Sequence, residues 1–250
     1  MHRFYCPDVK LEIDQIVSIL EKEEIHHLKS VLRLKEQDQI SIFNRQGEEA
    51  VGTIRLIKDK QVAVRVDYLQ SNARFKPVVS ITMACAIPKK AKFDFIVEKC
   101  TELGVMEIFP LLTQRGDVSV KPLQFEKKLK RYHAIAVNAS KQCGRRDVPV
   151  VHPVIHFSDF FKANPKPDSL KLIPYLGSRE QRKSLWEVFP LVKNEIVFLI
   201  GPEGDFSPVE IDLAIKSGCV PISLGDLILK VDTAAISVVA CANSYFFHQK

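Results

Sequence analysis

Two glycine-bearing turns, each following an apolar stretch, are the part of this sequence best suited to bind a small molecule. The first is Gly201-Pro202-Glu203-Gly204, and the second is Ser223-Leu224-Gly225. Glycine lets backbone amides and carbonyls approach a planar ligand that a Cβ would block. Neither turn has the Gly-Lys-Ser/Thr or G-x-G-x-x-G pattern of a phosphate loop. The turns therefore indicate a site for something other than nucleotide phosphates.

Carboxylates near the first turn occur in two different settings. Ser207, Pro208 and Glu210 have the spacing of a capping box, which predicts a helix beginning at Pro208 and a structural role for Glu210. Glu203 lies inside the turn, upstream of this cap, and the cap does not explain it. We therefore treat Glu203 as a candidate for chemistry.

The composition is that of an ordinary globular protein of one or two domains, with 250 residues, 46% of them hydrophobic and 26% charged. The N-terminus lacks the hydrophobic region of a signal peptide and no apolar run reaches ~18 residues, so we expect a cytoplasmic protein with no membrane span. Six cysteines and seven histidines show no zinc-type spacing, so we expect buried or incidental thiols and no metal.

The positive charge is concentrated in the middle of the chain. Residues 73–149 contain 15 Lys and Arg against 7 Asp and Glu, whereas residues 1–72 and 150–250 each have a net charge of −1. Such a field favours a polyanionic partner, because each neutralised phosphate releases counterions. A solvated basic helix face with no partner is the alternative.

The chain has two organisational halves. Period-2 alternation predicts a small, mainly β domain over residues 1–72, with one short helix, and the polar stretch 70–77 is a linker. Beyond it, apolar runs alternate with helical patterns, which predicts a parallel sheet covered on both faces over residues 73–250. Strands are expected at 38–43, 50–57, 61–66, 78–86, 106–112, 171–176, 196–200 and 220–224, and helices at 23–34, 89–103, 124–143, 179–189, 208–216 and 233–247.

Several short motifs occur together in one order. They are His26-His27-Leu28, Thr101-Glu102-Leu103-Gly104-Val105, Gly144-Arg145, Gly201-Pro202-Glu203-Gly204, Ser223-Leu224-Gly225 and Ile228-Leu229-x-x-x-Thr233-Ala234-Ala235. Together they resemble the RsmE-type methyltransferases of the SPOUT superfamily, over almost the whole chain.

This resemblance implies an α/β fold, a SPOUT-type knotted parallel-sheet domain with a C-terminal trefoil knot, preceded by a small PUA-like β-barrel that binds RNA. It implies S-adenosylmethionine as cofactor and methylation of N3 of a specific uridine in small-subunit (16S) ribosomal RNA. It also implies a homodimer. The apolar final helix is a candidate for the dimer interface, although burial against the same chain explains that helix equally well.

Some positions depart from the family pattern. Asp205 stands where a second glycine is usual, and Lys230-Val231-Asp232 replaces the usual Arg-Thr-Glu. The lysine and aspartate keep the charge but change the reach of the side chain, and lysine lacks the bidentate fork of arginine.

The resemblance also implies which residues bind the cofactor, through backbone groups and apolar side chains. For the apolar members, plain core packing is the alternative. The expected cofactor-binding residues are Leu176, Gly177, Ile200, Gly201, Pro202, Glu203, Gly204, Leu224, Gly225, Ile228, Leu229 and Thr233.

Methylation of uracil N3 needs removal of its proton and donors for the resulting negative charge. Glu203 and Asp232 are the candidate proton acceptors, and Arg145 is the favoured substrate contact. Glu203 is alternatively a loop organiser, and Asp232 alternatively caps the last helix. The expected RNA-binding residues are Arg33, Lys89, Lys92, Arg115, Lys127, Lys128, Arg131, Arg145 and Arg146.

Two other functions remain open. One is a SPOUT enzyme that methylates a ribose 2′-hydroxyl of transfer or ribosomal RNA. The other is an RNA-binding ribosome assembly factor whose cofactor site has decayed, which the departures at Asp205 and Lys230-Val231-Asp232 motivate.

Overall fold

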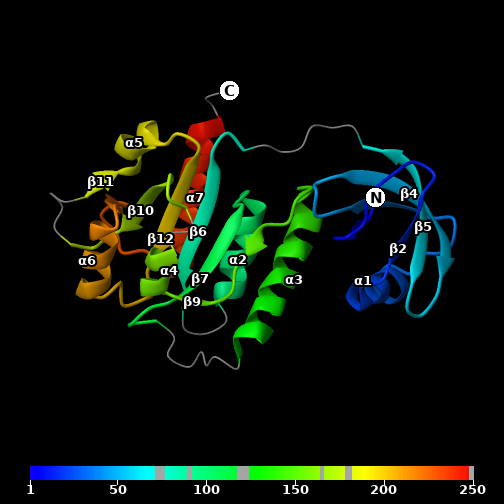
Figure 1. The fold of residues 1–250 in the computed structure, drawn as a ribbon, viewed down its shortest axis with the longest axis horizontal. Coiled ribbons are helices and arrows are strands. Elements are labelled where there is room, and N and C mark those ends of the chain that lie inside the picture. Colours follow the sequence, from blue (N-terminus) through cyan, green and yellow to red (C-terminus); the bar gives the residue numbers. More distant parts are fainter. Residues whose placement is uncertain (71–76, 89–91, 117–123, 164–165, 178–181, 248–250) are drawn as a thin grey trace. The chain divides into compact units, whose positions relative to one another are not determined.

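The computed structural model describes residues 1–70, 77–88, 92–116, 124–163, 166–177 and 182–247 (Figure 1). The chain forms two compact units. The first contains Met1–Lys76 and Ser140–Val148, and the second contains Pro77–Ala139 and Pro149–Lys250. The expected boundary between residues 72 and 73 lies outside the described residues.

The first unit is built on a curled five-stranded sheet of order β1-β3-β4-β5-β2, in which β1 pairs with β3 in parallel and the other pairs are antiparallel. The predicted strands β3, β4 and β5 are confirmed, while β1 and β2 were missed. The elements are β1 (Arg3–Tyr5), β2 (Ile16–Ile19), α1 (Lys22–His26), the π-helical turn η1 (His27–Val31), β3 (Gln39–Phe43), β4 (Glu49–Ile57) and β5 (Val62–Leu69).

Glycine at position 52 allows β4 to approach β5 closely. A Cβ there would lie 2.5 Å from the carbonyl oxygen of Arg65. The pairing register of the two strands also shifts beside Gly52, and such irregularities bend a sheet. Ile25 and Leu28, from α1 and η1, join the apolar core of this unit. The predicted packing of a short helix on the small sheet is thus confirmed.

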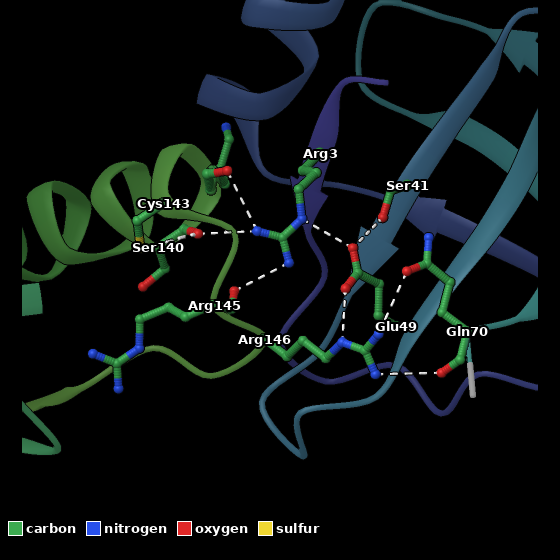
Figure 2. A network of polar contacts seen from close by, with 9 residues as sticks. Arg3, Ser41, Glu49, Gln70, Ser140, Cys143, Arg145 and Arg146 are labelled. Carbon is green, nitrogen blue, oxygen red and sulfur yellow. Dashed lines mark hydrogen bonds and ion pairs between the residues drawn. The ribbon is translucent and has the colours of Figure 1, made fainter. Parts of the chain in front are cut away.

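A buried carboxylate on β4 ties the segment Ser140–Val148 to the first unit (Figure 2). Glu49 Oε1 accepts hydrogen bonds from Arg3 Nε at 2.9 Å and from Ser41 Oγ at 2.5 Å, and Glu49 Oε2 lies 3.1 Å from Arg146 Nε. Although burial raises the pKa of Glu49, the Arg3 and Ser41 hydrogen bonds and the charge of Arg146 lower it below its usual value. This carboxylate therefore stays ionised between two guanidinium groups.

A second buried ion pair holds the same segment. Lys141 Nζ donates to both carboxylate oxygens of Glu24, at 2.8 and 3.0 Å. Arg3 also donates to the carbonyl oxygens of Ser140 and Arg145, both at 3.0 Å. The nine residues from Ser140 to Val148 are therefore an integral part of the first unit.

The second unit is built on a parallel sheet of order β11-β13-β10-β12-β6-β7-β8, with β9 also pairing with β7. All its described pairings are parallel, as predicted. The elements are β6 (Ser80–Ala86), α2 (Lys92–Glu102), β7 (Glu107–Leu112), α3 (Phe125–Cys143), β8 (Val150–Val151), β9 (Ile155–His156), α4 (Phe157–Ala163), β10 (Leu170–Pro174), β11 (Lys183–Ser184), α5 (Leu185–Val188), the 3₁₀ turn η4 (Phe189–Leu191), β12 (Glu195–Ile200), α6 (Pro208–Lys216), β13 (Val220–Ser223) and α7 (Val231–Phe247).

Helices cover both faces of this sheet, as predicted (Figure 1). On one face, Val197 and Leu199 of β12 pack in a core cluster with Phe160 of α4 and Ile211 of α6. On the other face, α7 contacts β12, β6 and α2. β12 is apolar from Ile196 to Ile200. Because side chains alternate along a strand, these residues serve both faces of the sheet.

The prediction of one continuous helix over 179–189 is wrong, although its second half contains a short helix. Of this range, residues 182–189 are described, and they form β11, the short helix α5 and the start of η4. Ser184 and Glu187 form a capping box, so the helix begins only after Ser184, and Pro190 lacks the amide needed to continue it. The short elements β8, β9 and α4 were missed, and α7 begins at Val231, two residues earlier than expected.

All six cysteines are free thiols, and four of them are buried. Among the described residues, none of the helices is both long and apolar enough to cross a membrane.

Candidate active site

A pocket of about 630 Å³, including its open mouth, lies at the carboxyl ends of β10, β12 and β13. These strands are neighbours in the sheet. Ligands of α/β proteins characteristically bind at this edge of the sheet. Both glycine turns contribute to the same pocket, so the structure brings together two segments that the sequence separates.

Most of the predicted cofactor-binding residues line this pocket. They are Leu176, Ile200, Gly201, Pro202, Glu203, Leu224, Gly225, Ile228 and Leu229. Gly177, Gly204 and Thr233 are not among the described lining residues, although each is adjacent in sequence to the segments that are. The binding role of every one of these residues stays a prediction.

Other lining residues were missed. Asp205, Leu227, Val231 and Ala234 lie in or beside the motifs, so the motifs themselves could have suggested them. Arg182 belongs to no motif, and only the folding of β11 beside β13 brings it to the pocket. The remaining missed residues, Pro174, Tyr175 and Ile222, are at the ends of β10 and β13.

The first turn is shaped by glycine at 201 and aspartate at 205. A Cβ on Gly201 would lie 3.1 Å from the ring of Phe206, so a side chain at this position would require the ring to shift. Asp205 has a φ of 59°, in the left-handed region that favours glycine and that aspartate tolerates better than most residues. Its amide donates to the carbonyl of Pro202 at 2.9 Å, and its Oδ1 accepts from the Phe206 amide at 2.8 Å. The departure at Asp205 therefore occupies a glycine-like backbone conformation.

Arg115 supports this turn from outside. Its Nη1 donates to the carbonyl oxygens of Gly204 at 2.9 Å and of Phe206 at 3.4 Å. Arg115 was predicted as an RNA contact, and the structure shows it bonded to the turn that lines the pocket.

The predicted capping box after the turn is confirmed. Ser207 Oγ accepts from the amide of Glu210 at 3.3 Å, and Glu210 Oε2 accepts from the amide of Ser207 at 2.8 Å. Both residues are buried. Glu210 Oε1 additionally accepts from the amide of Gln114 at 2.8 Å, so the carboxylate joins α6 to the segment that carries Arg115.

The second turn exposes apolar side chains next to the pocket. Gly225 has a φ of 115°, which a residue with a Cβ rarely adopts, and its amide donates to Ser223 Oγ at 3.3 Å. Leu227 and Ile228 are 81% and 80% exposed although both line the pocket. Apolar surface at the mouth of a pocket is typical of a ligand or partner site.

The two candidate proton acceptors differ in position. Glu203 lines the pocket and is partly exposed, and its Oε1 lies 3.8 Å from Lys92 Nζ. Asp232 is in the first turn of α7 and is not among the described lining residues. Its Oδ1 is buried without a hydrogen-bond partner in the described part of the chain.

Arg145 and Arg146 belong to the first unit, whereas the pocket lies within the second. The Arg145 side chain is only 6% exposed, and its Nη2 is 2.7 Å from Asp147 Oδ2. Arg146 is bound to Glu49 (Figure 2). Both guanidinium groups are thus engaged by carboxylates of their own unit.

The other predicted RNA-binding residues are distributed over both units. Arg33 is exposed on the first unit, with a φ of 54°. On α3, Lys127 is exposed and Arg131 pairs with Asp94. Lys89 lies outside the described residues. The RNA contacts of all of them stay predictions.

Residues 75–243 match a family model described as an RNA methyltransferase domain, and residues 20–67 match one described as an RNA methyltransferase PUA domain. The chain belongs to the RsmE-type RNA methyltransferase family. It is 31% identical to a ribosomal RNA small subunit methyltransferase E of Synechocystis, over 93% of this chain and 75% of the relative. It is 30% identical to the protein of that name from Mesomycoplasma hyopneumoniae, over 94% of this chain and 96% of the relative.

Solved structures with the same fold include members that hold S-adenosylmethionine. A methyltransferase from Legionella pneumophila with this cofactor bound has a TM-score of 0.88 at 30% identity, covering 97% of both chains. The ribosomal RNA small subunit methyltransferase E of Neisseria gonorrhoeae, bound to S-adenosylmethionine, has a TM-score of 0.86 at 27% identity, covering 98% of both chains.

Proposed function

We propose that this RsmE-family chain transfers the methyl group of S-adenosylmethionine to N3 of one uridine in small-subunit (16S) ribosomal RNA. The observation that carries the proposal is the convergence of both glycine turns on one pocket at the carboxyl ends of β10, β12 and β13. Relatives that align over nearly the whole chain are named for small-subunit ribosomal RNA methylation, which supports the substrate class. A ribosomal RNA substrate is also consistent with the cytoplasmic location expected from the sequence.

The residues of the pocket fit S-adenosylmethionine, which supplies an electrophilic methyl group on a sulfonium when bound. Gly201 and Gly225 leave backbone groups accessible, because a side chain at either position is sterically or conformationally disfavoured. Ile200, Leu224 and Leu229 offer apolar surface to an aromatic ring. The backbone of the two turns would bind the polar edge of the adenine, and these three side chains its faces.

Glu203 is our proposed acceptor for the proton on uracil N3. It lines the pocket and is open to solvent, so a splayed base can reach it. Loss of the proton leaves negative charge on the ring carbonyls, and the ammonium of Lys92, near the Glu203 carboxylate, is placed to stabilise that charge. Asp232, off the described pocket wall, remains a second candidate.

RNA binding is assigned to the basic surface of α3, to Lys92 and to the PUA-type unit. Exposed lysines such as Lys127 would contact phosphates without reading sequence. Arg145 and Arg146 are paired with carboxylates of their own unit, which favours a structural role for both residues over direct contact with RNA.

We further propose that the second unit forms the trefoil knot of the SPOUT superfamily and that the protein is a homodimer. The segments 174–176, 200–205 and 222–231, which converge on the pocket, are those that knot loops would supply. Ala234, Val238, Val239, Ala242 and Phe246 of α7 are buried within the chain itself. The more exposed surface of Leu227 and Ile228 is therefore a better candidate for contact with a second copy.

The test is methylation of small-subunit RNA with isotope-labelled S-adenosylmethionine, followed by nuclease digestion and mass spectrometry of the nucleosides. We expect the label in N3-methyluridine, and no label with the variant Gly201→Val, whose side chain must displace Phe206. Label on a ribose would support the 2′-O-methyltransferase. Retained RNA binding with no cofactor binding would support the decayed assembly factor.

A further inference from the structure

We propose that Arg182 binds the α-carboxylate of the methionine part of S-adenosylmethionine. This inference rests on the proposed function and extends it, because it assigns one end of the pocket to the amino-acid end of the ligand. Arg182 directly precedes the edge strand β11, and its side chain is part of the pocket wall.

The hydrogen bonding of Arg182 is incomplete in the described part of the chain. Its Nη1 donates to the carbonyl oxygen of Tyr175 at 3.2 Å, which fixes the guanidinium against the end of β10. Its Nε is buried and has no hydrogen-bond partner among the described residues. Buried polar groups in native proteins are nearly always partnered, so an unpartnered charged donor in a pocket wall indicates a ligand acceptor.

The charges of the pocket complement those of the ligand. Of the described lining residues, Arg182 is the cation, and Glu203 and Asp205 are the anions. S-adenosylmethionine has one anionic group, the α-carboxylate, and two cationic groups, the α-ammonium and the sulfonium. Pairing opposite charges leaves the carboxylate for Arg182 and places the cationic groups toward the two acidic residues.

The geometry of the guanidinium also favours a carboxylate. A carboxylate binds the Nε–Nη2 edge of an arginine through two parallel hydrogen bonds. The unpartnered Nε belongs to that edge, while the bond to Tyr175 uses the other terminal nitrogen. Tyr175 therefore orients the fork, which makes its carbonyl a positioning group for Arg182.

The experiment compares two ligands that differ in one group. Isothermal titration measures the affinity of the full-length protein for S-adenosylhomocysteine and for its decarboxylated analogue, in which hydrogen replaces only the carboxylate. We expect the variant Arg182→Gln to bind S-adenosylhomocysteine about 10- to 30-fold more weakly and to bind the analogue as the wild type does. Arg182→Lys, which keeps the charge without the fork, should lose an intermediate amount.

The control variant is Lys183→Gln, an exposed neighbour that is not among the described lining residues, and it should bind both ligands normally. The affinities for S-adenosylhomocysteine and for the analogue are measured on the same variant. A general loss of folded protein affects both equally and cancels in their ratio. An equal loss for both ligands, or no loss, would overturn the proposal. Failure of the wild type to bind S-adenosylhomocysteine would instead refute the proposed function.

Discussion

Single side chains in and beside the pocket determine the shape of its first turn. Arg115 bonds the carbonyls of Gly204 and Phe206, and the Asp205 carboxylate caps the Phe206 amide in a left-handed backbone conformation. These bonds fix a segment that has no secondary structure of its own. The turn is therefore preorganised by residues that do not all touch the ligand site, and their loss should appear as weaker cofactor binding.

Replacement of Arg115 by alanine should weaken binding of S-adenosylmethionine about 5- to 10-fold, because the turn loses two hydrogen bonds from an exposed donor. The effect should appear in the KM for the cofactor and leave kcat nearly unchanged, and Arg115→Lys should restore part of it. Arg131→Ala removes the same charge without touching the turn and should bind the cofactor normally. Should Arg115→Ala weaken only RNA binding, Arg115 is the RNA contact predicted from the sequence.

A charged cluster at the amino ends of β7 and β12 predicts a pH-dependent stability. Glu107 Oε2 lies 2.7 Å from His152 Nε2, and Lys166 pairs with the other oxygen of Glu107. The His152 hydrogen bond and, after it, the Lys166 interactions outweigh burial and lower the pKa of Glu107 from 4.5 to about 2. Because the folded-state pKa is depressed, the stabilisation is complete above pH ~4.5 and is lost as the pH falls toward 2.

The variant Glu107→Gln should therefore be less stable than the wild type by about 2–3 kcal/mol at pH 7. The difference should shrink as the pH falls from 4.5 toward 3, as measured by urea unfolding at each pH. Glu126→Gln, which removes a carboxylate from a surface pair with Lys130, should have little effect at any pH. A difference for Glu107→Gln that is constant with pH would contradict the assigned pKa.

Residues of the pocket were predictable where they lie in motifs, and unpredictable where distant segments meet. Gly201 and Leu229 were identified because their motifs have a recognisable spacing. Arg182 was not, because only sheet pairing brings it to the pocket. The pairing of Arg146 was equally unpredictable, since its partner Glu49 is distant in sequence and no local pattern signals their contact.

Among the elements, two helices begin at capping boxes that differ in burial. The box of α6, Ser207 and Glu210, is buried and also accepts the amide of Gln114. The box of α5, Ser184 and Glu187, is exposed. An unsatisfied amide costs more free energy where water cannot replace the lost partner.

The variant Ser207→Ala should thus lower the free energy of unfolding by about 1–2 kcal/mol, and Ser184→Ala by about 0.5 kcal/mol. Chemical denaturation of the two variants measures both values in the same protein. Equal losses would show that burial of the cap does not matter here.

Long elements with a clear period were predicted within a few residues, as β12, α3 and α6 illustrate. The elements that were missed, such as β8, β9 and α4, are too short for a period to appear. The helix predicted over 179–189 is reduced to α5, because the capping box at Ser184 starts the helix there and Pro190 lacks the amide needed to continue it.

At the scale of the whole molecule, the uneven charge determines how the protein should meet RNA. Some of the excess Lys and Arg side chains in residues 73–149 form internal ion pairs, among them Lys141 and Arg146. Their charges are therefore compensated within the protein. The remaining basic surface includes exposed side chains of α3: Lys127, and Lys130, whose pair with Glu126 is open to solvent. The electrostatic footprint is therefore smaller than the sequence alone suggests.

Reversing the charge of Lys127 and Lys130 to glutamate should weaken RNA binding and reduce the slope of log K against log salt by about 1–2. The matched control reverses Lys162 and Lys216, two exposed lysines on α4 and α6. Binding measured at several salt concentrations separates the two pairs. An unchanged slope for the α3 pair would make this helix face a solvated surface without a partner.

The membership of Ser140–Val148 in the first unit has a consequence for how this protein was assembled. A gene fragment encoding only residues 1–76 would leave Glu24 and Glu49 buried without Lys141 and Arg146, which neutralise them. The first unit is therefore not encoded by one contiguous segment that recombination or engineering could transfer as a whole. Any functional transplant must also carry Ser140–Val148, which lies in the sequence between the two parts of the second unit.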